Sequence, residues 1–573
     1  MEPCPRHAQG GLMKSLRAGG SGKANATAAL CAIKDLSQDW NLVVVGGGIT
    51  GAGVFQQAVR MGLKVLLVEQ NDYASGTSSR SSKLVHGGLR YLKEGRFFLT
   101  RDAVKQRERL LKEASGLVTP LTFLVPVYKE HGPGKWALEA GLAIYDLIAK
   151  KRQHQFYNPS EFVACVPAIE QKGLIGGFQF VDAQVDDARL VLRLITDGIR
   201  QGGQALNYTQ VVAVNRDREG KVSGVTIRDA QSGRTLALHT PAVINATGCW
   251  AEFLHPSPKP QLHIRPLRGS HIIFPASKIP ISQAVSFIHP RDQRALFLLP
   301  WEGAVILGTT DLDHPYSLSR EPVITSDEVA YLMEGLNTLF PSLALSAKAC
   351  LSTMAGVRPV LSQGNRDPSQ ESREHAVWVD HGLITVTGGK LTTFGLLAAD
   401  ALKAAKPFLS ADWNSIPEAV LFGEPLPFQE APHPLSAAQW QCLCGRYGEA
   451  ALEIVHNADP RDLEMVPGTR TLWAEFAYAA RHEQVRCLGD LMLRRLRVGL
   501  LTPHGGREHL GRIRRLCEPA LTWGRRRWRR EIREYLDHWQ MAHGLPSSRP
   551  RGRLHSWWRR WRDGVANLAA NWR

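Results

Sequence analysis

The feature that most constrains the fold of this chain is a glycine-rich turn that follows a short apolar run. Residues 41–45 read Asn-Leu-Val-Val-Val, a β-branched run typical of a buried parallel strand. The turn follows at once as Gly46-Gly-Gly-Ile-Thr-Gly51-Ala-Gly53, and an amphipathic stretch then extends to a glycine at position 62. A second apolar run over residues 64–68 ends at Glu69. The pattern predicts the strand–turn–helix–strand unit of a nucleotide-binding sheet.

Each part of this unit has a physical role in holding a dinucleotide. Gly46 permits the tight turn, Gly48 lets the backbone approach a pyrophosphate, and Gly51 allows the helix and strand to pack closely. The N-terminus of the helix attracts negative charge. Glu69 lies 23 residues past Gly46, where its carboxylate can accept from a ribose hydroxyl, which favours an unphosphorylated adenosine ribose as in FAD or NAD. The alternative is an ordinary glycine-rich turn that binds no nucleotide.

Two later apolar runs are predicted to belong to the same sheet. Residues 242–246 are closed by Thr-Gly, and residues 383–387 are closed by Gly388-Gly389 and followed by a predicted helix over 391–406. Segments with β-character lie between them, at residues 269–274 and 294–308. We therefore expect a β-rich domain inserted into the first, then a proline-rich linker and a helical stretch rich in Leu, Ala and Arg.

Length and composition agree with a multidomain globular protein. The 573 residues are 44% hydrophobic and 21% charged, which excludes a disordered, collagen-like or disulfide-scaffold chain. No run of roughly 18 apolar residues exists, so a soluble or peripheral protein is expected. Of the nine cysteines only Cys442 and Cys444 are close, without a histidine cluster, so no metal is expected. Residues 1–39 lack the apolar core of a secretory signal and are predicted to be a flexible leader, with a transit peptide or a start at Met13 as alternatives.

The C-terminal segment, residues 521–573, is basic and rich in tryptophan. It holds thirteen Arg against four Asp or Glu, a net charge of +9, and seven of the fifteen Trp. Arg and Trp together suit an anionic lipid interface. The alternatives are a basic helix packed by its Trp face and a segment that binds nucleic acid. We expect this segment to hold the protein on a membrane without taking part in its chemistry.

Residues 74–92 form a hydroxyl-rich loop with two basic positions near its end. The loop reads Ala-Ser-Gly-Thr-Ser-Ser-Arg-Ser-Ser-Lys-Leu-Val-His-Gly-Gly-Leu-Arg-Tyr-Leu. Hydroxyl groups can donate hydrogen bonds to phosphate, and His86 and Arg90 flank a Gly-Gly pair that lets a ligand approach the backbone. A serine-rich run alone is more often a solvated loop, but its place after the nucleotide fingerprint predicts a ligand-binding one.

On these residues the chain resembles the FAD-dependent glycerol-3-phosphate dehydrogenases. The shared motifs follow the family's order over about residues 40–405, and residues 493–500 resemble a helix of the family's C-terminal domain. The motifs are Gly46 to Gly53, Gly76-Thr-Ser-Ser79, Ser82-Lys-Leu-Val-His-Gly-Gly-Leu-Arg-Tyr91, Val185-Asp-Asp-Ala-Arg-Leu190, Arg268-Gly-Ser-His271, Gly308-Thr-Thr-Asp311, Gly356-Val-Arg-Pro359 and Gly388-Gly-Lys-Leu-Thr-Thr393.

The resemblance implies a fold of the α/β plus α+β class. It consists of a glutathione-reductase-type FAD-binding Rossmann fold with an inserted β-rich substrate cap domain and a C-terminal helical domain. The expected FAD-binding parts are residues 40–120, 185–262 and 351–406, and the expected cap parts are 121–184 and 263–350. The remaining segments are the leader 1–39, the linker 407–434, the helical domain 435–520 and the basic tail 521–573.

The resemblance also implies a reaction, the oxidation of sn-glycerol 3-phosphate to dihydroxyacetone phosphate with hydride passing from C2 to FAD N5. His86 is the expected base, because a free imidazole with a pKa of about 6.5 suits that role. Arg358 is expected to stabilise the developing alkoxide, and Lys390 to add positive charge near substrate and flavin. The implied substrate-binding residues are Arg90, Tyr91, Arg358, Arg373 and Lys390, since a guanidinium fork matches phosphate oxygens.

FAD is expected to bind tightly but without a covalent bond, since no Cys or His stands at a recognisable flavin-linkage motif. The helix after Gly388-Gly389 would place its positive N-terminus at the pyrimidine end of the flavin. The implied cofactor contacts are Gly46, Gly47, Gly48, Ile49, Thr50, Gly51, Glu69, Gln70, Thr77, Ser78, Ser79, Ser82, Lys83, His86, Gly87, Val212, Gly248, Gly389, Lys390, Leu391 and Thr392.

Three functions stay open at this point. They are a dehydrogenase that passes electrons to a membrane quinone, a soluble oxidase of the same substrate that reduces oxygen, and an RNA-binding flavoprotein. The arginines expected around the flavin favour the first two, and the Arg/Trp tail favours the quinone. We therefore expect glycerol 3-phosphate, a membrane quinone and an anionic membrane surface as partners, with a homodimer allowed and no nucleic acid. The expected location is the cytoplasm, peripherally at the inner face of the cell membrane.

Overall fold

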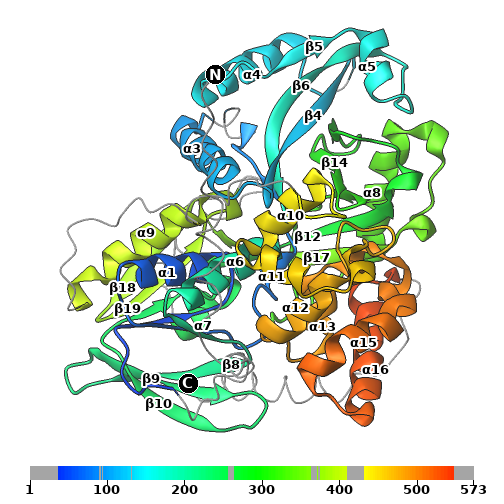
Figure 1. Ribbon diagram of the computed structural model, residues 1–573. Helices are drawn as coiled ribbons and strands as arrows, with labels where there is room; N and C mark the ends of the chain where they lie inside the picture. The colour runs from blue at the N-terminus through cyan, green and yellow to red at the C-terminus, as the bar shows by residue number, and fades with distance from the viewer. Residues whose placement is uncertain are drawn as a thin grey trace, which may run out of the picture.

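The computed structural model of the chain describes residues 36–89, 92, 95–130, 132–255, 263–362, 371, 374–409, 422 and 431–546. Figure 1 shows three parts: a β-rich cap at the top, a nucleotide-binding domain at the lower left and a helical C-terminal domain at the lower right.

A six-stranded sheet in the order β18-β19-β11-β1-β2-β7 forms the nucleotide-binding domain. β1 (Leu42–Val45) pairs in parallel with β2 (Val65–Val68) and β11 (Val243–Asn245), and β11 pairs in parallel with β19 (Leu383–Gly388). The edge strands are β7 (Gln204–Leu206), parallel to β2, and β18 (His375–Asp380), antiparallel to β19. The strands predicted at residues 41–45, 64–68, 242–246 and 383–387 are confirmed, and they meet in one sheet although they lie far apart in sequence.

Both faces of this sheet are covered, which explains why its strands are apolar without alternation. α1 (Ile49–Arg60), α6 (Asp187–Arg200) and α9 (Phe394–Ala405) pack together on one face, in a core that includes Leu42 and Val44. Val43 and Val45 point to the other face and pack against a small antiparallel sheet, visible at the bottom of Figure 1. Its strands are β8 (Thr209–Arg216), β9 (Val222–Asp229) and β10 (Thr235–His239).

The cap is a ten-stranded sheet in the order β16-β12-β15-β14-β13-β4-β6-β3, with β17 paired to β12 and β5 to β6. Its strands are β3 (Leu84–Val85), β4 (Val118–Tyr128), β5 (Gln155–Tyr157), β6 (Leu174–Val185), β12 (Ile264–Pro275), β13 (Ala284–Ile288), β14 (Ala295–Trp301), β15 (Ala304–Gly308), β16 (Leu312–Asp313) and β17 (Ser352–Leu361). α5 (Pro159–Cys165) and α8 (Ser326–Leu339) pack on this sheet, and α3 (Phe97–Glu113) contacts both α4 (Lys135–Ala149) and the sheet.

The predicted boundaries of the cap need correction at β3, which lies within the expected FAD-binding part 40–120 but pairs with β6, and more extensively at β17. Residues 351–406 were expected to belong to the FAD-binding domain, but β17 pairs with β12 over ten residue pairs, from Ile264↔Leu361 to Ile273↔Ser352. Arg358 therefore stands on a strand of the cap sheet, opposite Leu267. An apolar strand pattern does not say which strand it pairs with, so the sequence could not distinguish the two sheets.

The C-terminal domain is helical, as predicted, but it extends past residue 520. Its helices are α10 (Ala437–Tyr447), α11 (Ala450–His456), α12 (Ala474–His482), α13 (Leu488–Asp490), α14 (Val498–Leu501), α15 (Leu510–Leu521) and α16 (Arg525–Ala542). The expectation that residues 521–573 form a tail outside this domain is wrong for α16. Trp528 and Trp539 are only 1% and 5% exposed and belong to the same core as α15. Residues 547–573 lie outside the described residues.

No helix in the described ranges is long and apolar enough to cross a membrane. Within those same ranges no group of His, Cys, Asp and Glu could hold a metal ion.

Candidate functional site

A cavity of about 1960 Å³ opens between the nucleotide-binding sheet and the cap. This is larger than the roughly 300–1,000 Å³ of an ordinary small-molecule site. Its walls come from the turn after β1, the segment after β2, the ends of β11 and β19, and the cap strands β4, β6, β14 and β17. The space is thus sufficient for a dinucleotide together with a second ligand.

The glycine-rich turn has the geometry that the fingerprint predicts. Gly46 has a φ of +110°, which favours glycine, and a Cβ at Gly51 would lie 1.9 Å from the carbonyl oxygen of Gly46. The start of α1 therefore packs directly on the end of β1. The N–H of Ile49, the first residue of α1, donates to Ser78 Oγ at 2.9 Å, so the hydroxyl-rich loop meets the helix N-terminus, where a pyrophosphate is attracted.

Glu69 lies at the end of β2 and lines the cavity. Its carboxylate accepts the N–H of Gly47 at 2.7 Å and the N–H of Asn71 at 2.8 Å. Burial raises the pKa of this carboxyl, while the two backbone donors oppose the rise. An ionised carboxylate has four acceptor positions, so two accepted hydrogen bonds leave capacity for a ribose hydroxyl.

Most of the residues expected to contact the cofactor line this cavity. They are Gly46, Gly48, Ile49, Thr50, Glu69, Gln70, Thr77, Ser78, Ser82, His86, Val212, Gly248, Gly389, Lys390, Leu391 and Thr392. Gly47, Gly51, Ser79, Lys83 and Gly87 are described residues that do not line it. Arg90, Tyr91 and Arg373, expected at the substrate phosphate, lie outside the described residues.

The expectation that the side chain of Lys83 contacts the cofactor is wrong. Its ammonium is fully buried and donates to the Ser79 carbonyl and to Asp187, each at 2.7 Å. Burial lowers the pKa of Lys83 to about 8, with Arg497 contributing in the same direction. A buried ammonium must be paired, so this lysine ties the hydroxyl-rich loop to α6 and its side chain is not available to a ligand in the cavity.

Arg358 presents a fixed positive charge to the cavity from β17. Its guanidinium donates to Asp311 Oδ1 at 2.9 Å and to Thr309 Oγ1 at 3.0 Å. A Cβ at Gly269 would lie 2.2 Å from Arg358 Nη2, so only glycine lets the guanidinium cross β12 at this point. Lys390 lines the same cavity at the end of β19. Because arginine stays protonated, this group can stabilise negative charge but cannot serve as a base.

Arg294 and Asp311 are cavity residues that the sequence analysis did not select. Asp311 is 4% exposed and interacts with both arginines, since Arg294 Nη1 donates to its carbonyl at 3.2 Å and Arg294 Nη2 lies 3.6 Å from Oδ2. Asp311 belongs to the motif Gly308-Thr-Thr-Asp311, so the sequence did contain a signal for its place in the site. Arg294 had no sequence signal, because only the pairing of β14 with β15 and of β15 with β12 brings it to this site.

His86 lines the cavity on a loop held from two sides. Its backbone N–H donates at 3.2 Å to Oγ1 of Thr392, a residue that follows β19. On the other side the Gly87 N–H donates to Tyr145 Oη at 2.9 Å and to Asp182 Oδ1 at 3.1 Å. Arg107 Nη1 donates to the same phenol at 2.9 Å and the same carboxylate at 2.7 Å. Asp182 lines the cavity. None of the three residues Asp182, Tyr145 and Arg107 belongs to a motif that the sequence analysis selected.

This arrangement defines a dinucleotide-binding protein with a charged ligand site beside the fingerprint. A family model described as FAD dependent oxidoreductase matches residues 41–400, and a second, described as the C-terminal domain of alpha-glycerophosphate oxidase, matches residues 410–528. The chain therefore belongs to the family of FAD-dependent oxidoreductases, and FAD is its cofactor.

Within that family the chain is similar to glycerol-3-phosphate dehydrogenases. An aerobic glycerol-3-phosphate dehydrogenase of Staphylococcus aureus strain MRSA252 is 34% identical over 388 residues, which is 66% of this chain and 70% of that protein. The crystal structure of the glycerol-3-phosphate dehydrogenase from Bacillus halodurans complexed with FAD is 26% identical, with a TM-score of 0.72, and covers 91% of this chain and 97% of that chain. The resemblance derived from the motifs and the fold class that it implied are confirmed.

An oxidase shares the fold as well. The dithionite-reduced L-alpha-glycerophosphate oxidase from Mycoplasma pneumoniae with FAD bound is 17% identical, with a TM-score of 0.53 over 66% of this chain and 97% of that chain. At this identity the match shows the fold alone.

Proposed function

We propose that this enzyme oxidises sn-glycerol 3-phosphate to dihydroxyacetone phosphate and passes the electrons to a membrane quinone. The observation that carries the proposal is the convergence of His86, Arg358 and Lys390 on one cavity beside the FAD fingerprint. The names of the relatives agree with the substrate. Arg90 and Tyr91 are proposed to bind the phosphate because of the motif at residues 82–91, and Arg373 because of the family resemblance.

The chemistry follows from what each group can do. Lys390 attracts the phosphate dianion electrostatically, and a guanidinium holds phosphate oxygens in a fixed fork. The His86 imidazole accepts the proton of the C2 hydroxyl. Arg358 stabilises the oxygen as negative charge develops, since Asp311 and Thr309 hold its guanidinium in place. When bound, FAD supplies the acceptor for the hydride.

One side of the same cavity is lined by apolar side chains, which supports an apolar electron acceptor. These side chains come from the cap sheet and from α3 and α4, namely Phe97, Phe123, Val125, Leu138, Ile144, Phe180 and Phe297. Phe97 and Ile144 are 52% and 39% exposed, and their helix neighbours Phe98 and Leu147, which do not line the cavity, are 79% and 77% exposed. We therefore infer that this side of the cavity opens beside α3 and α4, where a quinone ring could enter from a lipid phase.

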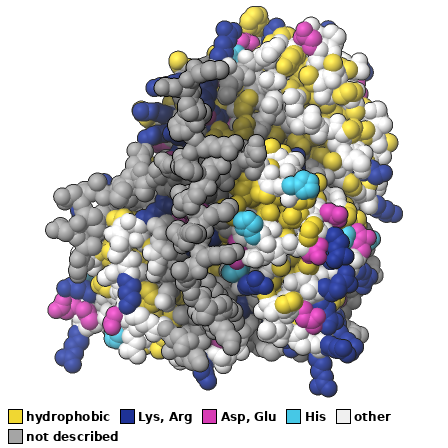
Figure 2. Space-filling view, viewed as in Figure 1, with side chains coloured by type: hydrophobic (Ala, Val, Ile, Leu, Met, Phe, Trp, Pro, Cys, Tyr) yellow, Lys and Arg dark blue, Asp and Glu magenta, His cyan; other side chains and the backbone are white. Residues whose placement is uncertain are grey.

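The surface around this opening is suited to a membrane. We call it the α3–α4 face, defined by the exposed side chains Phe97, Phe98, Trp136, Ile144 and Leu147. Large apolar side chains this exposed mark an interaction site when they cluster. Exposed basic residues accompany them, namely Arg101, Lys105, Lys150, Lys151 and Arg152. Figure 2 shows basic side chains beside apolar ones at the upper left, where Figure 1 places α3 and α4. We therefore propose this face as the membrane contact rather than α16, whose residues Trp528 and Trp539 are buried.

The reaction is tested by mixing the holoenzyme with glycerol 3-phosphate without oxygen and recording the visible flavin absorbance. We expect bleaching by glycerol 3-phosphate but far slower bleaching by glycerol, because each charge-assisted hydrogen bond lost costs about 1.5–3 kcal/mol. Arg358→Lys should bleach slowly, because an ammonium cannot reproduce the fork. Equal rates with the two alcohols would contradict the substrate assignment.

The acceptor is tested on the bleached enzyme. Rapid recovery of the flavin colour with a short-chain quinone and slow recovery in air supports a dehydrogenase, whereas rapid recovery in air alone indicates an oxidase. The homodimer stays a prediction that size-exclusion chromatography can check.

The membrane contact is tested by flotation with vesicles that contain anionic phospholipid. The double variant Phe98→Ser with Trp136→Ser should bind more weakly than the unaltered protein. The control is Met465→Ser, which removes an exposed apolar side chain from the C-terminal domain. Equal binding of both variants would contradict docking through the α3–α4 face.

A further inference from the structure

The C-terminal domain carries an arginine cluster that no step of the proposed reaction uses. Arg494, Arg495 and Arg497 come from the motif at residues 493–500, where the helical turn Leu491–Arg495 ends. Their side chains are 12%, 0% and 2% exposed. Buried guanidinium groups require partners, and the partners of these three lie largely in another domain.

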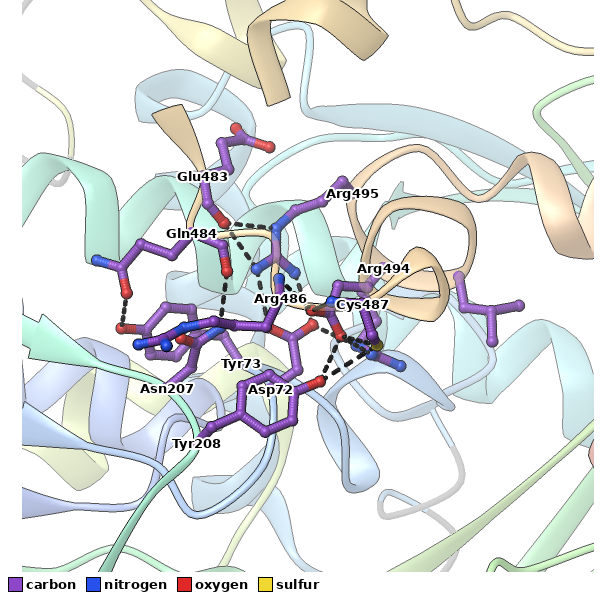
Figure 3. A network of polar contacts seen from close by, with 12 residues as sticks. Asp72, Tyr73, Asn207, Tyr208, Glu483, Gln484, Arg486, Cys487, Arg494 and Arg495 are labelled. Carbon is purple, nitrogen blue, oxygen red and sulfur yellow. Dashed lines mark hydrogen bonds and ion pairs between the residues drawn. The ribbon is translucent and has the colours of Figure 1, made fainter. Parts of the chain in front are cut away.

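The first two arginines share Asp72 of the nucleotide-binding domain. Arg495 donates from Nη1 to Asp72 Oδ2 at 2.7 Å and from Nη2 to Oδ1 at 2.8 Å, a bidentate pair. Arg494 Nε donates to Asp72 Oδ2 at 2.5 Å. Figure 3 shows both side chains converging on this carboxylate from the C-terminal domain.

Arg497 reaches the same domain at a second point. Its Nη1 donates to the carbonyl oxygen of Ser79 at 3.2 Å, and its Nε and Nη2 donate to Asp186 Oδ1 at 3.1 and 2.9 Å. A further contact from the C-terminal domain comes from Gln484, whose Oε1 accepts the phenol of Tyr73 at 3.0 Å.

These contacts fall on one wall of the cofactor cavity, residues 68–82, and they involve the residues of that wall that face away from the cavity. Between residues 68 and 82 every residue lines the cavity except Asp72, Tyr73 and Ser79. Those three are the residues of the wall that the C-terminal domain contacts through the bonds just described. The wall segment therefore has one face toward the cofactor cavity and its opposite face held by the C-terminal domain.

The connection between β7 and β8 is held in the same network. Asn207 Nδ2 donates to Asp72 Oδ1 and to the Gln484 carbonyl, both at 3.0 Å, and Tyr208 Oη donates to Asp490 Oδ1 at 2.7 Å. Asn207 and Tyr208 lie beside Asp72 and Gln484 in Figure 3. Residues 209–212, which follow directly, line the cavity.

The wall segment includes a backbone conformation that must be held. Ala74 has a φ of +59°, a left-handed conformation that costs energy in a residue other than glycine. It lies directly after Asp72 and Tyr73, and its N–H donates to the Gly47 carbonyl at 2.9 Å. A segment ordered before its ligand arrives binds more tightly, because the ordering cost has already been met.

We propose that the C-terminal domain is a clamp for FAD, and that Asp72, Tyr73 and Arg495 are positioning residues for the cofactor. They act through the wall at residues 68–82 and do not touch the cofactor themselves. The clamp explains why the motif at residues 493–500 accompanies the FAD motifs, although it lies outside the nucleotide-binding fold.

The test compares FAD release with global stability in the full-length holoenzyme. Asp72→Asn weakens the arginine pairs, and Tyr73→Phe removes a single hydroxyl from the wall. The control is Glu302→Gln, because Glu302 pairs with Arg446 of the C-terminal domain but belongs to a cap turn that does not line the cavity. FAD release is followed after dilution as flavin fluorescence in the filtrate, and unfolding is followed by circular dichroism.

We expect Asp72→Asn to release FAD about tenfold faster, because the loss of one hydrogen bond to a charged group corresponds to about a tenfold change in binding. Tyr73→Phe should release it a few times faster, and Glu302→Gln at the unaltered rate even if its unfolding midpoint falls. Release that simply follows the midpoint in all three variants would overturn the proposal. If Asp72→Asn does not fold, an unchanged rate of FAD release in Tyr73→Phe would likewise overturn the proposal. Because no substrate is present, the outcome is independent of the proposed reaction.

Discussion

Replacing Tyr145 by phenylalanine removes one buried oxygen that holds the His86 loop. That oxygen accepts from the Gly87 N–H and from Arg107, both at 2.9 Å, and donates to Asp182 at 2.8 Å. Burial raises the pKa of this phenol well above its usual value, so it remains a donor at neutral pH. Gly87 and Arg107 each keep a bond to Asp182. No charge is left unpaired, so we expect a loss of about 1–3 kcal/mol in the free energy of unfolding.

The reaction should be affected more than substrate binding. A displacement of the loop by about 1 Å moves the base away from the C2 hydroxyl and can lower kcat by up to about a hundredfold. We expect kcat to fall at least about tenfold on this basis, while KM changes little, because the phosphate-binding residues are not altered. The assay is the steady-state oxidation of glycerol 3-phosphate from pH 6 to 9 with an artificial dye as acceptor.

The matched control for this variant is Tyr157→Phe. Its phenol donates a single hydrogen bond at 3.1 Å to Gln179, on the cap and away from the His86 loop. The control should keep its kcat. If Tyr145→Phe lost stability but kept kcat and its pH profile, the phenol would have no role in positioning the base.

Three further outcomes follow from the packing. Gly51→Ala should purify without flavin colour, because the new Cβ would lie 1.9 Å from the Gly46 carbonyl oxygen, and full FAD content would contradict the close approach. Burial, mainly, lowers the pKa of His543 to about 3, so below about pH 6.5 only the unfolded state gains this proton and stability falls by up to about 1.4 kcal/mol per pH unit. His543→Gln should flatten that fall between pH 6 and 4 in urea unfolding, and parallel curves would refute it. A chain that ends at residue 520 should not fold, because removing a buried tryptophan such as Trp528 alone costs about 3–5 kcal/mol, and a flavin-loaded truncated protein would show otherwise.

The nucleotide-binding unit was predictable because its signals are local. A glycine with positive φ at position 46, a glycine against its carbonyl at position 51 and an acid at the end of β2 are each required by backbone geometry within about 25 residues. The strands β11 and β19 were also predictable from the sequence, because strands covered on both faces are apolar throughout. The motifs likewise selected His86, Arg358 and Lys390, which the fold brings to one cavity.

The remainder depended on partners that the sequence does not specify. Periodicity states which side of a segment is apolar but not what covers that side. An Arg/Trp helix looks the same whether its tryptophans face lipid or a protein core, and only the packing of α16 against the C-terminal domain decided between them. Similarly, β17 could have joined either sheet, and Lys83 could have faced a phosphate or a buried aspartate. By itself the sequence determined the local βαβ unit and its chemistry, whereas contacts between distant segments decided which charges face the cofactor cavity and which hold its walls.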